Sequence, residues 1–391
     1  MPSTNPALAE GGTNPLALLR EEVARRRAGG VDLRDLSIGD PDEPTPTAVR
    51  DALRAAVGPV SSYPTGPGRL ETREAVARFV ARRHGVTVDP ASQVLITSGS
   101  KEAILHLPFA FVDPGGPRRT VVWGSPGYPT YARGARLAGG APHAVVLTEA
   151  DGWRLDLTRL DEDVLARTCI AWIGYPHNPT GATVDLPYLR DQLAVARAHD
   201  VVLCSDECYQ ELWFDTPAPS LLEATGDDAR GALAVLSLSK RSGMTGYRSG
   251  AIVGDASLVA PLRRLREDTG TASPDFVQAA ARAAWDDDAH VVERRATFAA
   301  KRAVVLDALA ALGLTWSGSA ATFYVWVRVP GGDDVAYARG LLDAGVVATP
   351  GRAFGTGGEG WLRLALVPDV DGCRDAMGRW ADALRRGQLP V

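Results

Sequence analysis

Cysteine is scarce in this sequence, and its spacing does not suggest a disulfide framework. The four cysteines are Cys169, Cys204, Cys208 and Cys373, and none of them forms a C-x-x-C pair. Three of the four lie in or beside segments that we expect to be buried strands, where a free cysteine behaves as a small apolar side chain. We therefore expect reduced cysteines, a cytoplasmic protein and no metal ion.

Long apolar runs and an excess of one charge are also missing. No uncharged apolar segment is long enough to cross a bilayer, and residues 1–12 lack the basic region and apolar core of a targeting signal. The net charge is only -5, and acidic and basic residues are interspersed, so the sequence indicates no surface for nucleic acid or for an anionic membrane. We expect neither partner.

The sequence does contain a repeated alternation of apolar, strand-like runs and helices. Helices are expected at residues 15–28, 47–57 and 70–84. Strands are expected at residues 94–97, 120–123, 144–147, 169–174, 201–205, 232–238 and 251–253. This order predicts an α/β fold with a mostly parallel sheet that is covered on both faces. A long helical region after residue 274 and a strand at 323–329 with alternating faces predict a second domain.

Lys240 follows the most strand-like run of the chain, residues 232–238. A partly desolvated lysine has a depressed pKa, and its neutral amine can form a Schiff base with an aldehyde cofactor or a carbonyl substrate. Ser237, Ser239 and Arg248 supply phosphate ligands around the same point. A surface lysine in a glycine-rich turn is the alternative, but the combination favours a phosphorylated aldehyde as the ligand.

Polar residues also stand near the ends of other expected strands, where open α/β sheets bind ligands. Gly99, Ser100 and Lys101 precede an apolar helix, so their amides could bind a phosphate, although many such turns use Gly and Ser only for their geometry. Tyr128 could stack on a planar ring or pack in the core.

Two further strand ends carry an amide and a carboxylate. Asn178 lies between prolines that fix its amide, which could donate to a phenolate or a carboxylate or simply form a turn. Asp206 ends a buried run, where it could pair with a protonated pyridine nitrogen or cap the next helix.

Arg363, Gly39 and Tyr63 stand out nearer the two ends of the chain. Arg363 lies inside an apolar strand and needs an anion, either an internal carboxylate or that of a substrate. Gly39 lies at a turn where the backbone could approach a ligand, with a plain turn as the alternative. Tyr63 lies in a loop rich in Pro and Gly and could cap the core or face a ligand or a second subunit.

Taken together, these segments resemble the fold type I, pyridoxal-phosphate-dependent aminotransferases of class I/II, from about residue 14 to the end of the chain. The motifs that carry the resemblance are Gly99-Ser-Lys101, Tyr128 in Pro-Gly-Tyr-Pro, Asn178-Pro-Thr-Gly181, Asp206-Glu-Cys-Tyr209 and Ser237-x-Ser-Lys240 with Arg248. The resemblance implies a large cofactor-binding domain with a seven-stranded, mostly parallel sheet (residues 49–280). It also implies a smaller α+β domain (281–391), to which part of the N-terminal segment 1–48 belongs.

The resemblance further implies pyridoxal 5'-phosphate as the cofactor and a homodimer with shared active sites. Lys240 would form the Schiff base and move the substrate's α-proton, Asp206 would pair with the ring nitrogen, and Tyr128 would stack on the ring. The remaining cofactor contacts would come from Gly99, Ser100, Lys101, Asn178, Tyr209, Ser237, Ser239, Arg248 and the partner subunit's Tyr63. The substrate would contact Gly39, Asn178 and Arg363, the last by its α-carboxylate.

Within the superfamily, the sequence is most similar to bacterial N-succinyl-LL-diaminopimelate aminotransferases of lysine biosynthesis, with glutamate as the implied amino donor. That similarity lies in Ser205–Tyr209, in Ser237–Ser242 and in Trp285–Val291 with Arg294. The segment Gly243-Met-Thr-Gly-Tyr247 is instead that of more general aminotransferases, so aspartate, aromatic or other 2-oxo acid transamination is the alternative, followed by β-lyase chemistry. Arg34, Arg328 and Arg352 are candidates for a distal carboxylate, and nothing in the sequence chooses among them.

A regulator that only senses pyridoxal phosphate is a further alternative from a different class. Such regulators carry a DNA-binding head, whereas only a short arm and one helix are expected before Gly39. This segment is too short for a helix-turn-helix module, which favours an enzyme.

Overall fold

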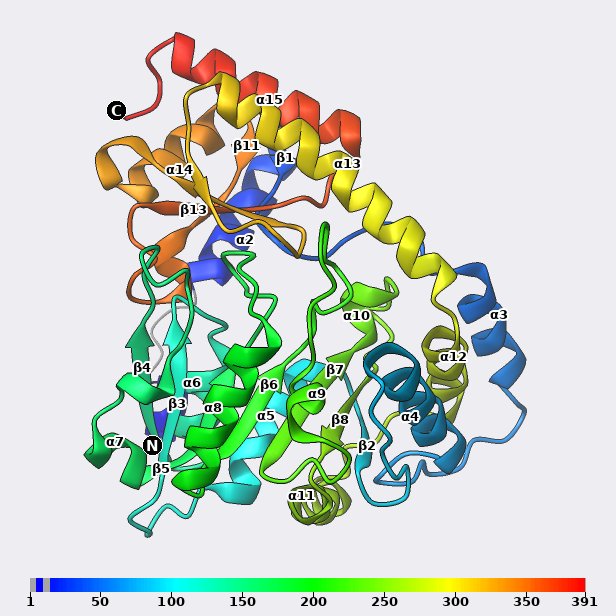
Figure 1. Cartoon of the computed structure of the whole chain (residues 1–391). Coiled ribbons are helices and arrows are strands. Elements are labelled where there is room, and N and C mark those ends of the chain that lie inside the picture. The colour runs from blue at the N-terminus through cyan, green and yellow to red at the C-terminus, as the bar shows by residue number, and fades with distance from the viewer. Residues whose placement is uncertain (1–4, 10–14, 391) are drawn as a thin grey trace, which may run out of the picture.

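The computed structural model of the chain describes residues 5–9 and 15–390, and its centre is a seven-stranded sheet in the order β2-β8-β7-β6-β5-β3-β4 (Figure 1). The strands are β2 (Val94–Thr97), β3 (Thr120–Ser125), β4 (Ala141–Val146), β5 (Thr168–Ile173), β6 (Val202–Asp206), β7 (Ala232–Ser237) and β8 (Gly250–Gly254). Within this sheet β8 runs antiparallel to β2 and β7, and the other pairs are parallel. The predicted α/β fold with a mostly parallel sheet is confirmed.

Helices cover both faces of this sheet, which explains why its strands are continuous apolar runs. In β7, Leu233 and Val235 pack on one face, whereas Ala234 and Leu236 pack on the other, and all of them are buried. The first face is covered by α5 (Ser100–Phe111), α6 (Thr130–Leu137) and α11 (Ala256–Thr269). The second is covered by α4 (Leu70–His84), α8 (Leu186–Ala198), α9 (Leu221–Thr225) and α12 (Asp275–Asp286), with α3 (Thr47–Ala56) packed on α12.

A smaller unit lies beyond the carboxyl ends of the parallel strands (Figure 1). Its antiparallel sheet has the order β12-β13-β10-β9, and a separate parallel pair joins β1 to β11. These strands are β1 (Arg34–Asp35), β9 (Trp316–Ser317), β10 (Tyr324–Arg328), β11 (Val346–Val347), β12 (Thr349–Pro350) and β13 (Trp361–Ala365). The helices of this unit are α2 (Pro15–Ala28), α13 (Ala289–Ala311), α14 (Asp334–Asp343) and α15 (Val370–Arg385). The β1–β11 pair joins Arg34 and Asp35 to the C-terminal part of the chain.

Short helical segments complete the described chain. They are α1 (Pro6–Ala9), η1 (Leu157–Arg159), α7 (Glu162–Arg167), α10 (Leu238–Arg241), η2 (Pro330–Gly332) and η3 (Gly351–Phe354). Parts of the expected N-terminal arm, residues 1–4 and 10–14, lie outside the described residues. Within residues 5–9 and 15–390, no helix is both long enough and apolar enough to cross a membrane.

The strand β10 differs from its prediction, because its faces do not alternate between buried and exposed. Tyr324, Val325, Trp326 and Val327 are all buried. Val325 and Val327 belong to the core of the smaller unit, whereas Trp326 stacks on Trp361 at 5.8 Å in a cluster that reaches the large sheet. The strand therefore lies between two cores, and both of its faces are apolar.

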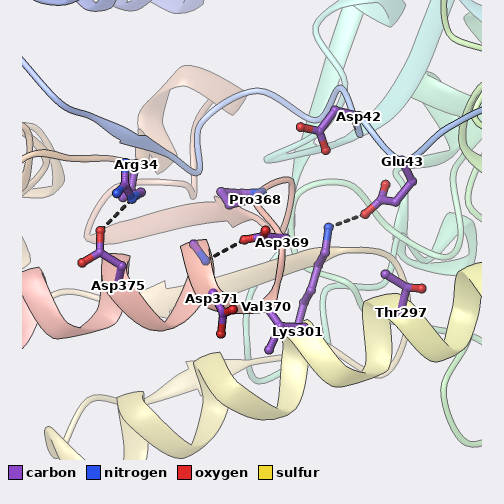
Figure 2. A pocket seen from close by; sticks show the side chains of 11 residues that line it. Arg34, Asp42, Glu43, Thr297, Lys301, Pro368, Asp369, Val370, Asp371 and Asp375 are labelled. Carbon is purple, nitrogen blue, oxygen red and sulfur yellow. Dashed lines mark hydrogen bonds and ion pairs between the residues drawn. The ribbon is translucent and has the colours of Figure 1, made fainter.

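A cavity of about 820 Å³ lies between α13, the start of α15 and the segment that follows Gly39 (Figure 2). Its charged side chains hold one another: Lys301 pairs with Glu43, and Arg34 pairs with Asp375. Of the residues singled out in the sequence, only Arg34, a candidate for a distal carboxylate, lines it. The Glu43–Lys301 pair fastens the segment after Gly39 to α13, and the Arg34–Asp375 pair joins β1 to α15.

Candidate active site

A second cavity, of about 560 Å³, opens at the carboxyl ends of the parallel strands and contains most of the expected site residues. Those that line it are Gly39, Ser100, Lys101, Tyr128, Asn178, Asp206, Tyr209, Ser237, Ser239, Lys240, Arg248 and Arg363. Other lining residues are Arg20, Ile38, Asp40, Pro129, Cys208, Thr245, Tyr324 and Phe354. The wall therefore combines strand ends of the large sheet with segments of the smaller unit.

Lys240 lies in α10, directly after β7, so the buried strand carries its amine to the floor of the cavity. Its Nζ donates a hydrogen bond to the carbonyl oxygen of Gly39. Burial lowers the pKa of Lys240 to about 8, although the nearby Asp40 carboxylate favours the charged form. A considerable fraction of this amine is therefore neutral near pH 8 and available as a nucleophile or base.

Asp206 ends β6 and is buried without a cationic partner in the described part of the chain. Tyr131 donates from its hydroxyl to Oδ2 at 2.9 Å, and the amide of Cys208 donates to Oδ1 at 3.2 Å. Burial raises the pKa of Asp206, and these donors only partly oppose the shift. A cation presented from the cavity would restore the charge of the carboxylate, which fits the protonated nitrogen of a pyridine ring.

An anion cradle lies where α5 begins. Gly99 has a φ of 81°, which favours glycine, and a Cβ there would lie 2.6 Å from Nη2 of Arg248 and displace its guanidinium. The first amides of α5 belong to Ser100 and Lys101. Arg248 donates to the carbonyls of Thr245 and Ser98 and has no carboxylate partner among the described residues. Helix amides and an unpaired guanidinium suit a phosphate dianion.

Tyrosine and asparagine side chains also line the cavity. Burial raises the pKa of Tyr128 to about 12, so its ring is neutral and presents an apolar face. The hydroxyls of Tyr209 and Tyr324 lie 2.9 Å apart. Nη1 of Arg363 donates to Oδ1 of Asn178 at 2.9 Å, so the NH₂ group of that amide is left to donate elsewhere.

Arg363 is buried in β13 without an ion pair to any carboxylate in the described residues. Its Nη2 donates to the carbonyl of Ser37, and its guanidinium lies 4.3 Å from the ring centre of Tyr324. The internal salt bridge considered from the sequence is therefore absent from the described part of the chain. A buried guanidinium without an anion is suited to bind a carboxylate.

Tyr63 is 102% exposed and does not line the cavity of its own chain, so its expected contribution to the site of a partner subunit stays a prediction. Three arginines considered for a distal carboxylate also lie outside this cavity and pair with carboxylates of the chain: Arg34 with Asp375, Arg328 with Glu149 and Arg352 with Asp334. Two lining residues, Arg20 from α2 and Tyr324 from β10, and the contact of Tyr131 with Asp206 were not predicted from the sequence. Tyr324 begins a strand of the smaller unit, and no residue pattern around it indicates that it reaches a cavity of the large sheet.

Comparison with known proteins agrees with this geometry. The family model for aminotransferase class I and II matches residues 31–378. The chain belongs to the class I and II aminotransferase family. It is a pyridoxal-phosphate-dependent aminotransferase, as the sequence predicted, and the unpaired Asp206, the cradle at Gly99 and the amine of Lys240 fit that cofactor.

Individual relatives give a finer comparison. The chain is 38% identical over 376 residues to the LL-diaminopimelate aminotransferase of Desulforudis audaxviator, with 95% of each chain covered. It is 37% identical to the enzyme of the same name from Moorella thermoacetica, covering 93% of this chain and 94% of that one. Among solved structures, a probable N-succinyldiaminopimelate aminotransferase from Thermus thermophilus superposes with a TM-score of 0.87 at 30% identity, covering 94% of this chain and all of that one.

Proposed function

We propose that this aminotransferase moves an amino group between LL-diaminopimelate and a 2-oxo acid, with glutamate as the other amino acid of the pair. The observation that carries the proposal is the similarity to enzymes named for that substrate, at 36–38% identity over nine-tenths of both chains. N-succinyl-LL-diaminopimelate, the substrate favoured by the sequence motifs, is the second candidate. It is supported by the structural neighbour of that name, at the lower identity of 30%.

The site residues have complementary roles in this proposal. Pyridoxal phosphate supplies the electron-withdrawing ring that makes the α-proton of the amino acid acidic. Asp206 holds a proton on the ring nitrogen, and Tyr128 packs against the ring. Arg248, Ser237 and the amides at the start of α5 hold the phosphate. Asn178 and Tyr209 donate to the phenolic oxygen.

Lys240 and Arg363 act on the substrate. Arg363 holds the α-carboxylate by two parallel hydrogen bonds, which fixes the α-carbon above the floor of the cavity. The amine of Lys240 would hold the cofactor and would move the proton at the α-carbon of the substrate. The burial that lowers the pKa of Lys240 to about 8 suits it for both tasks, since a base near the working pH is the most efficient.

A homodimer belongs to this proposal. Tyr63 and Phe276 are exposed large side chains, which is consistent with a surface covered by a second copy. In that arrangement the partner subunit's Tyr63 completes the phosphate site.

The test is a donor panel with 2-oxoglutarate as the acceptor, in which the glutamate formed is quantified. The donors are LL-diaminopimelate, its N-succinyl derivative, aspartate and phenylalanine. The proposal predicts the highest kcat/KM with LL-diaminopimelate. A higher value with the succinylated compound would replace the substrate, and a higher value with aspartate or phenylalanine would exclude both diaminopimelate assignments.

A further inference from the structure

Tyr131, in α6, is a buried tyrosine behind the active-site cavity that has no role in the account above. Its hydroxyl donates to Oδ2 of Asp206 at 2.9 Å, and this side chain makes no other hydrogen bond among the described residues. Tyr131 does not line the cavity, whereas Asp206 does. Any effect of this hydroxyl on a bound cofactor therefore acts through the Asp206 carboxylate.

Aromatic packing holds the Tyr131 ring in place. The ring stacks on Trp172 of β5 with 5.1 Å between the ring centres, and it meets the Tyr128 ring edge to face at 5.8 Å. The backbone amide of Tyr131 also donates to the carbonyl of Tyr128 at 3.2 Å. These contacts fix the hydroxyl beside the end of β6, so its aim at Asp206 follows from the packing of the core.

Gly174, directly after β5, leaves room for the Tyr131 hydroxyl. A Cβ atom at position 174 would lie 2.9 Å from the hydroxyl oxygen and 3.6 Å from Cβ of Asp206. The φ of Gly174 lies outside the left-handed region, so space rather than backbone conformation favours glycine here. A larger residue would displace the hydroxyl from the carboxylate.

The hydroxyl of Tyr131 stabilises one charge state of Asp206. Burial raises the pKa of Asp206, and hydrogen bonds from the Cys208 side chain, from Tyr131 and from the Cys208 amide oppose this shift. A hydroxyl donates more strongly to a charged carboxylate than to a neutral carboxylic acid. The contact therefore favours the charged form, which is the form that accepts from a protonated ring nitrogen.

We propose that Tyr131 is a positioning residue for the cofactor: it orients the Asp206 carboxylate and favours its charged form, so that the site selects a ring with a protonated nitrogen. The inference rests on the proposed function, because it takes Asp206 as the partner of that nitrogen. It does not depend on which amino acid is the substrate. The contact with Tyr128 lets the same ring support both the stacking residue and the carboxylate of the cofactor site.

Two unreactive ligands of the cofactor-free protein test the proposal. Pyridoxine 5'-phosphate has an alcohol in place of the aldehyde and forms no Schiff base with Lys240, and its analogue carries a CH group in place of the ring nitrogen. Titration calorimetry gives both dissociation constants for the wild type, Tyr131→Phe, Gly174→Ala and Tyr188→Phe. Tyr188→Phe is the control, because it also removes one tyrosine hydroxyl, which donates to the carbonyl of Leu155 at 2.6 Å away from the cavity.

The ratio of the two dissociation constants measures the selectivity for the ring nitrogen. Tyr131→Phe should lower this ratio by about tenfold, because phenylalanine keeps the stacked ring and loses only the donor. Gly174→Ala should lower the ratio in the same direction, and Tyr188→Phe should leave it unchanged. An unchanged ratio in Tyr131→Phe would overturn the inference, since a purely structural role would weaken both ligands alike.

Asp206→Asn separates this inference from the role of Asp206 itself. Asparagine cannot carry the charge that the nitrogen requires, so we expect this variant to lose the selectivity, and adding Tyr131→Phe to it should change the ratio no further. A further fall of the ratio in the double variant would show that Tyr131 does not act through Asp206 and would overturn the inference. A wild-type ratio in Asp206→Asn alone would instead overturn the assigned role of Asp206, and the inference with it.

Discussion

The guanidinium of Arg363 donates a hydrogen bond to Oδ1 of Asn178 at 2.9 Å and so connects β13 with the loop that follows β5. A second nitrogen of the same guanidinium donates to the carbonyl of Ser37. One buried side chain thus holds the orientation of the Asn178 amide and the position of the segment leading to Gly39. The group proposed to bind the α-carboxylate is also the group that organises its surroundings.

Replacing Arg363 by lysine tests this double role. We expect Arg363→Lys to lower kcat/KM by about 100-fold for every amino donor, because an ammonium group cannot form parallel hydrogen bonds to a carboxylate while holding Asn178. Steady-state kinetics with the donor panel measure the loss. Pimelate and heptanoate, two unreactive carboxylates of equal chain length, should both bind more weakly to the cofactor-loaded variant. Loss with one class of donor only would contradict the assignment.

The pKa of Lys240 predicts how cofactor attachment depends on pH. Only the neutral amine attacks an aldehyde, and burial lowers the pKa of Lys240 to about 8 in the cofactor-free protein. The rate of attachment should therefore rise about tenfold per pH unit at low pH and level off above about 8. Stopped-flow absorbance after mixing with pyridoxal phosphate measures this rate. A rate that keeps rising towards the ordinary lysine pKa of 10.5 would indicate an amine that is not desolvated.

Replacing Gly39 by alanine tests how tightly the residues of the cavity wall pack against one another. A Cβ atom at this position would lie 2.0 Å from the hydroxyl of Tyr324. We expect Gly39→Ala to push Tyr324 and the Gly39 carbonyl apart and to reduce kcat/KM by about 100-fold. Gly378→Ala in α15 is the control, because nothing lies within 4 Å of its Cβ position. Equal kcat/KM values for the two variants would show that the cavity wall accommodates the added methyl group without loss of activity.

Glu43 tests the ion pairs that fasten the segment after Gly39 (Figure 2). It pairs with Lys301 and, at 3.5 Å, with Arg294, and both cations are buried. Glu43→Gln leaves these two charges without a carboxylate, so we expect the free energy of unfolding to fall by about 3 kcal/mol. Denaturation in urea measures it. Glu22→Gln, at an exposed pair on α2, is the matched control and should change stability little. An equal change in the free energy of unfolding in both variants would contradict this role of Glu43.

The large sheet was predictable because strands buried on both faces are continuous apolar runs. The run 232–238 became β7 (Ala232–Ser237), and Lys240 and Asp206 were placed at the strand ends by their position in the sequence alone. The same logic failed for β10, which lies between two cores. Its burial depends on how the two units pack, and no short stretch of sequence contains that information.

The charged residues show the same limit. Arg34 and Arg352 were reasonable candidates for a distal carboxylate until their partners Asp375 and Asp334 were seen. Asp375 is remote from Arg34 in sequence, so that pairing arises only in the folded chain. No sequence pattern distinguishes Arg20, because α2 has the composition of an ordinary charged surface helix. Only the packing of α2 on the smaller unit brings Arg20 to the cavity.

The half-reaction with LL-diaminopimelate tests the central claim most directly. The donor is added without an acceptor to enzyme loaded with pyridoxal phosphate, and the absorbance of the lysine-bound cofactor is followed in the wild type and in Lys240→Ala. The account predicts that the wild type loses this absorbance completely, recovers it when 2-oxoglutarate is added, and that Lys240→Ala never shows it. A wild-type spectrum unchanged by LL-diaminopimelate, but converted by aspartate or phenylalanine, would contradict the proposed substrate.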